Sequence, residues 1–172
     1  MHNLSSSVQA FATINKLPCS SFVAAYALDQ LGKVPTDPTD IDAWYSLDPE
    51  LWKIVNLWGG EDLLGSADNI YYLKKKLGGK IYHVDASPLP LSNGVYIVQR
   101  WCGSQGHSFL LSVKGNTTTI IDSNTSKGLT FRTVEGSDWF LPGCSHTLLH
   151  LEKKNNIIRI GALILIAAWI LT

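Results

Sequence analysis

The chain is organised around residues 18–32, which read PCSSFVAAYALDQLG. Apolar residues recur there at helical spacing, Pro18 suits the start of a helix, and Gly32 suits its end. We therefore expect Cys19 in the first turn of a helix with a buried face. The free N–H groups and the dipole at a helix start lower the pKa of a thiol and can form half of an oxyanion hole. A lone cysteine is also often a small buried residue with no chemical role.

Length and composition indicate one domain of ordinary size. The 172 residues carry 14 Lys and Arg against 14 Asp and Glu, and the charged fraction of 16% is below the usual quarter. No basic stripe is present, so nucleic acid is not expected as a partner. Cys19, Cys102 and Cys144 match no zinc or redox spacing. They allow either one bridge between Cys102 and Cys144 with Cys19 free, or three reduced thiols.

The order of the predicted elements indicates an α+β domain, with helices first and an antiparallel sheet second. Helices are predicted at 8–15, from Cys19, from Asp48 to Gly59-Gly60 and from Ser66 to Gly78-Gly79, with a turn-rich connector at 33–42. Strands are predicted at 80–84, 94–101, 107–114, 117–122, 129–134 and 146–151. Gly115-Asn116 predicts a hairpin between the third and fourth of these strands.

Two strands carry the groups that a catalytic Cys19 needs. His107 opens an apolar strand after a glycine-containing loop, and Asp122 ends the next strand 15 residues later. Because hairpin strands run antiparallel, these ends lie side by side. The carboxylate can then hold one ring nitrogen of His107 while the other nitrogen faces a thiol. Nucleophilic catalysis by cysteine uses this combination of thiolate, imidazole and orienting carboxylate. Taken singly, His107 also fits a core histidine and Asp122 a turn cap.

These residues resemble the papain-like cysteine hydrolase superfamily, in which a cysteine starts a helix, Gly-His opens a strand and Asp lies on the next strand. The segment Cys-Ser-Ser-Phe-Val at 19–23 resembles the helix start of NlpC-type cell-wall peptidases, with Ser21 where glycine is usual. It is also similar to the amidase effectors of type VI secretion, and the His–Asp spacing resembles YopT-type effector proteases and transglutaminase-like folds. The resemblance covers residues 15–35 and 94–128. It implies amide-bond hydrolysis or acyl transfer without a cofactor.

Further site residues are expected around this triad. In papain-like enzymes the second oxyanion donor is often a Gln or Asn side chain upstream of the cysteine, which makes Asn15 the nearer candidate and Gln9 the other. Ser20, directly after the cysteine, is a further candidate for oxyanion or substrate binding. Trp101 and Gln105 flank the loop before the histidine and are candidates for the wall of a substrate groove.

No metal site is expected. His83, His146 and His150 are scattered along the chain. His146 and His150 are four residues apart, but the surrounding pattern is that of a strand, which supplies no third ligand nearby. We expect all three histidines to be structural.

The end of the chain differs from the predicted catalytic domain at 1–152. Within the tail at 153–172, residues 157–171 are apolar except for Arg159. As a helix they would span about 22 Å, short of the roughly 30 Å hydrocarbon core of a bilayer. The tail is expected either to seek a membrane, with the domain on the cytoplasmic side, or to form a terminal core element. The N-terminus has no signal-peptide pattern, which leaves membrane association or signal-independent export as routes.

Three functions remain open on this basis. The first is a cysteine amidase or endopeptidase that cuts the stem peptide of peptidoglycan, as an antibacterial effector with an inhibitor or immunity protein as partner. The second is a membrane-associated cysteine protease that acts on proteins. The third is a binding module that keeps the fold without catalysis. The 19–23 motif favours the first function and the apolar tail favours the second.

Overall fold

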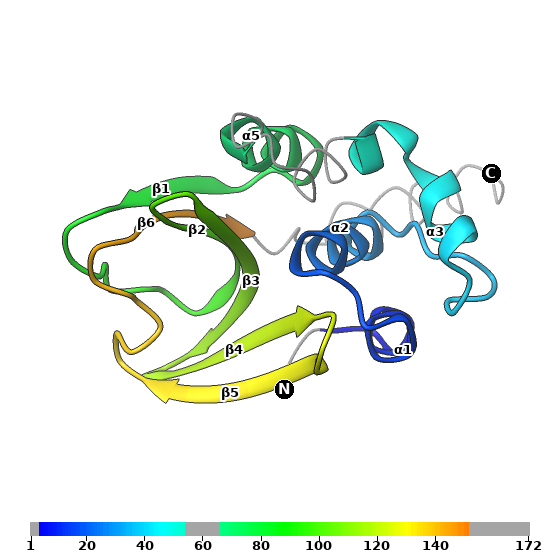
Figure 1. Cartoon of the computed structure of the whole chain (residues 1–172). Coiled ribbons are helices and arrows are strands. Elements are labelled where there is room, and N and C mark those ends of the chain that lie inside the picture. The colour runs from blue at the N-terminus through cyan, green and yellow to red at the C-terminus, as the bar shows by residue number, and fades with distance from the viewer. Residues whose placement is uncertain (1–3, 54–65, 152–172) are drawn as a thin grey trace, which may run out of the picture.

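In the computed structural model, which describes residues 4–53 and 66–151, helices form the first half of the chain and strands the second (Figure 1). The helices are α1 (Ser6–Asn15), α2 (Cys19–Gln30), α3 (Ile41–Leu47) and α5 (Ser66–Leu77), and residues 49–53 are also helical. The strands are β1 (Lys80–Val84), β2 (Gly94–Cys102), β3 (Gln105–Lys114), β4 (Thr117–Asn124), β5 (Gly128–Glu135) and β6 (Ser145–Leu151). The predicted α+β class with N-terminal helices is confirmed.

The strands form one antiparallel sheet in the order β1-β6-β2-β3-β4-β5. Strands β2 to β5 follow one another as neighbours, and β6 returns to lie between β1 and β2. Figure 1 shows the sheet strongly curved, with the helices gathered on its outer side and α2 beside β3. The turn at Gly115, whose φ is 60°, joins β3 to β4 as the predicted hairpin.

Side chains alternate between the two faces of the sheet, and both faces are covered. On β2, Ile97 packs with the helices, whereas Tyr96 and Val98 belong to a second buried cluster on the opposite face. Gln99 and Trp101 follow Ile97 with the same alternation. They therefore face the helices, on the side from which α2 approaches.

Helix α2 is buried along most of its length rather than on one face only. Every residue from Ser20 to Leu28 is buried, because the helix lies between the sheet and the other helices. Its end is fixed by two backbone hydrogen bonds, from Gly32 to Asp29 and from Lys33 to Leu28, both 2.9 Å. This pattern needs a left-handed residue after the helix, which Gly32 provides with a φ of 72°.

The predicted connector at 33–42 is too long, because α3 begins within it. The Asp40 carboxylate accepts hydrogen bonds from the N–H groups of Asp42 and Ala43 and so caps the helix. The helix predicted from Asp48 does begin there, with the carboxylate accepting from the N–H of Leu51 at 3.1 Å. Its predicted end at Gly59-Gly60 lies outside the described residues.

The predicted boundary at residue 152 and the apolar tail also lie outside the described residues. Of the helices that are described, none is long and apolar enough to cross a membrane.

A disulfide joins Cys102, the last residue of β2, to Cys144, just before β6, and leaves Cys19 as a free thiol. The first of the two arrangements open to the sequence is therefore the one found. The bridge closes a covalent loop between the end of β2 and the start of β6. It also fixes the position of Cys102, the residue next to Trp101.

Replacing Cys102 and Cys144 together by alanine should lower the free energy of unfolding. The bridge spans 42 residues, and loop-closure entropy for that length predicts a loss of up to about 4 kcal/mol. Urea denaturation under oxidising conditions measures the loss, and wild-type protein treated with a reductant is the control. Equal stability of the oxidised wild type and the double variant would mean that the bridge does not form.

Candidate active site

Strands β3 and β4 separate at one end. Their pairing ends at Leu110 and Ile121, although β3 continues to pair with β2 as far as Gln105, and β4 with β5 as far as Asn124. Within these described strands, the residues beyond Leu110 and Ile121 have no backbone partner across the gap. The start of α2 lies at this opening.

The segment before α2 is fastened to one strand and the Cys19 thiol to the other. The hydroxyl of Ser123, on β4, is fully buried and donates to the Leu17 carbonyl at 2.8 Å. The backbone of Ser108, on β3, hydrogen-bonds to the thiol of Cys19. Cys19 is the first residue of α2 and follows Pro18, as the sequence predicts. The segment that leads into α2 is therefore held by β4, and the thiol by β3.

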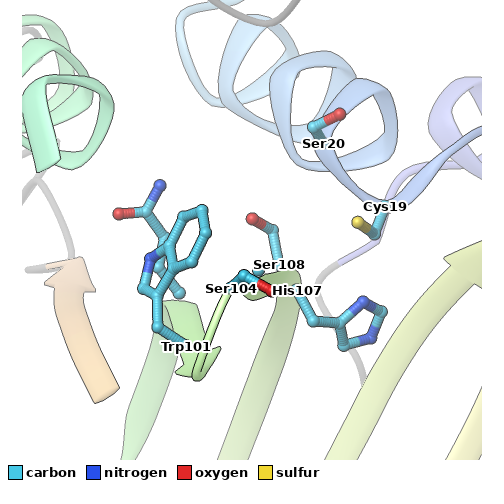
Figure 2. A pocket seen from close by; sticks show the side chains of 8 residues that line it. Cys19, Ser20, Trp101, Ser104, His107 and Ser108 are labelled. Carbon is cyan, nitrogen blue, oxygen red and sulfur yellow. The ribbon is translucent and has the colours of Figure 1, made fainter. Parts of the chain in front are cut away.

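Side chains of β3 and β4 also meet across the opening. Nε2 of His107 lies 2.8 Å from Oδ2 of Asp122. The other ring nitrogen, Nδ1, remains for the thiol, and the side chains of His107 and Cys19 share a hydrogen bond. Figure 2 shows the imidazole and the sulfur facing each other. The structure thus brings together the three residues that the sequence suggested as a triad.

The electrostatics of these groups favour a charged pair. Burial raises the pKa of the Cys19 thiol, but hydrogen bonds from His107 and the Ser108 backbone, together with the His107 charge, outweigh burial and hold that pKa below its ordinary value. The hydrogen bond to Asp122, and then the one to Cys19, raise the pKa of His107 to about 9. Both shifts act in the direction of a thiolate beside an imidazolium, and the thiolate is the nucleophilic form of cysteine.

A cavity of about 160 Å³ opens beside the sulfur. It is lined by Cys19, Ser20, Gln99, Trp101, Ser104, Gly106, His107 and Ser108. In Figure 2 the Trp101 indole stands opposite Cys19 and forms the far wall. A Cβ added at Gly106 would lie 2.4 Å from that ring, so the indole can lie over β3 only because residue 106 is glycine.

Three of the expected site residues lie elsewhere. The side-chain amide of Asn15 donates to the carbonyls of Phe11 and Thr39, at 3.3 and 3.1 Å, and does not line the cavity. The side-chain amide of Gln9 likewise donates a hydrogen bond to the carbonyl of Leu4. Gln105 is exposed beyond the β2–β3 turn and lies outside the cavity lining. Closeness to the cysteine in sequence was misleading for Asn15, because the left-handed Lys16 redirects the chain between α1 and α2.

Sequence reasoning missed Gln99, Ser104 and Ser108 as cavity residues. A signal was available for Gln99, because it occupies a helix-facing position of a buried strand where an apolar residue is usual. Ser108 carries the same signal on β3, next to His107.

His146 and His150 pack against aromatic rings. His146 is 1% exposed among Trp139 and Phe140, and burial lowers its pKa. His150 stacks on Tyr96 at 4.3 Å. Among residues 4–53 and 66–151, no group of three His, Cys, Asp or Glu side chains could hold a metal ion.

The described chain is thus an α+β protein with a Cys-His-Asp constellation at a helix start. A scan of protein-family models finds no match, and a search of curated proteins finds none either. Among solved structures, the chain is similar to the Pseudomonas avirulence protein AvrPphB, with a TM-score of 0.41 and 11% identity over 78% of this chain and 90% of that chain. A likeness of this degree assigns no activity, so the chemistry of the site rests on its own residues.

Removing the imidazole should raise the pKa of the Cys19 thiol. In His107→Ala, both contributions of His107 that lower this pKa are lost and burial, which raises it, remains. At pH 6.5, alkylation by iodoacetamide should slow by about tenfold for each unit of pKa shift. The pH dependence of the alkylation rate, followed by mass spectrometry of the Cys19 peptide, gives the pKa. His83→Ala, which removes an exposed histidine on β1, is the control, and an unchanged profile in His107→Ala would refute the pairing.

Asp122→Asn should lower the pKa of His107 from about 9, because the hydrogen bond to Asp122 is the largest of the contributions that raise it. Titration of the imidazole by NMR measures the shift. Asp138→Asn alters an exposed aspartate and should leave the His107 titration unchanged. A pKa that stays near 9 in Asp122→Asn would show that the carboxylate does not hold the ring.

Proposed function

We propose that the protein is a papain-like cysteine hydrolase that cleaves an amide bond. Cys19 is the nucleophile, His107 the general base and acid, and Asp122 the group that orients His107. The observation that carries this proposal is the 2.8 Å contact between His107 and Asp122, which leaves the other ring nitrogen to a thiol at a helix start.

The proposed reaction has two halves. The Cys19 thiolate attacks the amide carbon, and the carbonyl oxygen becomes an oxyanion. As the carbon–nitrogen bond breaks, the His107 imidazolium gives its proton to the leaving amine, and a thioester on Cys19 remains. A water molecule then gives a proton to His107 and attacks the thioester. The acid product leaves, and the thiolate and imidazolium are restored.

The start of α2 can stabilise the oxyanion. The first hydrogen bond within the helix runs from the N–H of Phe22 to the Pro18 carbonyl at 3.0 Å. The N–H groups of Cys19, Ser20 and Ser21 precede it and have no helical carbonyl to bind. The helix dipole adds to their attraction for negative charge.

The proposed substrate is the stem peptide of peptidoglycan. The Cys-Ser-Ser-Phe-Val segment supports this choice through its resemblance to cell-wall peptidases. The Cys102–Cys144 bridge supports it independently, because disulfides persist in oxidising compartments and the cell wall lies outside the reducing cytosol. As an antibacterial effector, the protein would be accompanied by an inhibitor or immunity protein in the cell that makes it.

A protease that acts on proteins near a membrane is the second candidate. The apolar stretch at 157–171 favours it, because such a segment seeks a bilayer and its flanking cations would keep the domain on the cytoplasmic side.

Purified sacculi and unfolded casein, incubated with wild type and with Cys19→Ala, test these functions. We expect wild type to release stem-peptide fragments from sacculi and Cys19→Ala to release none, because the variant lacks the nucleophile. Mass spectrometry of the soluble products identifies the bond that is cut. Cleavage of casein alone would favour the protease, and equal product from Cys19→Ala would contradict catalysis by this cysteine.

Expression in a Gram-negative host, with and without an added periplasmic signal sequence, provides the matching test in cells. Lysis that needs both the signal and Cys19 supports the cell-wall hydrolase. Toxicity that needs Cys19 but not the signal points to a cytoplasmic protein substrate.

A further inference from the structure

Three polar side chains of the cavity have no hydrogen-bond partner within residues 4–53 and 66–151. Gln99, Ser108 and Ser20 are 3, 6 and 7% exposed. Among the described residues, none of these side chains makes a hydrogen bond, although all three line the cavity beside Cys19. None of their polar atoms is among the fully buried side-chain atoms that lack a partner, so these atoms face the cavity and keep their capacity for hydrogen bonds. The three side chains are therefore free to form hydrogen bonds with a ligand that enters the cavity.

Their place in the fold puts them next to the reacting sulfur. Gln99 and Ser108 are direct partners in the β2–β3 register, and both face the helices. The backbone of Ser108 binds the Cys19 thiol, so Gln99 lies one strand further from the sulfur. Ser20 follows Cys19 on α2 and lines the cavity from the helix side, across from the strand residues Gln99 and Ser108. A substrate attacked by Cys19 would pass between these groups.

The chemistry of the lining indicates a neutral ligand. Apart from the Cys19–His107 pair, no charged side chain among the described residues lines the cavity. A carboxamide and two hydroxyls can each donate and accept hydrogen bonds. A carboxylate only accepts and an ammonium only donates, so either would leave part of the lining unpaired. An amide group, with one carbonyl and one or two N–H bonds, matches the lining in both respects.

We propose that Gln99, with Ser20 and Ser108, forms a subsite that hydrogen-bonds a neutral amide group of the substrate beside the bond attacked by Cys19. The amide is either a carboxamide side chain, as in Gln, or a peptide unit of the substrate backbone. Gln99 is the residue that determines this specificity, through a pair of complementary hydrogen bonds from its own carboxamide. This inference deepens the proposed hydrolase function and rests on it.

Peptidyl vinyl sulfones, which alkylate a catalytic thiolate, test the subsite. Three probes carry Gln, Met or Glu next to the electrophile, matched in size but different in hydrogen bonding and charge. If the amide is a side chain, wild type should be labelled by the Gln probe about tenfold faster than by the Met and Glu probes, the effect of one or two hydrogen bonds. A fourth probe with an N-methylated peptide nitrogen should be about tenfold slower than its parent if the amide is a peptide unit.

Gln99→Met is the decisive variant, because it keeps the length of the side chain and removes its hydrogen bonds. The rate ratio that distinguishes the probes in wild type should fall close to one. Gln105→Met changes an exposed glutamine outside the cavity and should keep the wild-type ratio. If Gln99→Met does not fold, Ser108→Ala, which removes one hydroxyl, should still reduce the ratio.

Reaction of Cys19 with methyl methanethiosulfonate, which contains no amide, measures the reactivity of the thiolate alone, and each probe rate is divided by it. Equal normalised rates for all four probes in wild type, or wild-type ratios retained in Gln99→Met, would overturn the subsite. A Cys19 that reacts with methyl methanethiosulfonate no faster than a free-cysteine peptide would instead contradict the proposed hydrolase.

Discussion

The hydrogen bond between His107 and Asp122 joins β3 to β4 where their backbones no longer pair. Before Leu110, β3 pairs with β2 and not with β4; after Ile121, β4 pairs with β5 and not with β3. The side-chain contact spans this gap in place of a backbone hydrogen bond. It fixes which nitrogen of the imidazole points at α2. Because the Ser123 hydroxyl holds the Leu17 carbonyl at the same opening, the position of the thiol depends on the same pair of strands.

The start of α2 differs from the starts of α1, α3 and the helical segment that follows Asp48. Ser5, Asp40 and Asp48 each accept a hydrogen bond from a backbone N–H of the following helix. Pro18 has no side-chain acceptor, so the first N–H groups of α2 are left without a cap of this kind. An uncapped start weakens a helix. Here the buried length of α2 compensates, and the free N–H groups stay available to negative charge at the sulfur or on a substrate.

Much of this arrangement could be predicted from sequence, because its signals are local. The strand pattern placed all six strands within about two residues of their ends, and Cys19, His107 and Asp122 stood out because each lies near the end of an element. Other features depend on the whole fold. Sheet order, the insertion of β6 and the separation of β3 from β4 have no local signature. Helix α3 was hidden by the prolines and aspartates of the preceding turns, although Asp40 was its cap.

The contact between Gly106 and Trp101 has a consequence for how this chain can vary. Since a methyl group at position 106 would meet the indole at 2.4 Å, the two positions form one steric unit across the β2–β3 pair. A larger residue at 106 requires a smaller one at 101, and the far wall of the cavity then recedes. In related chains these two positions should therefore covary, and each pair of residues should correspond to a different width of cleft.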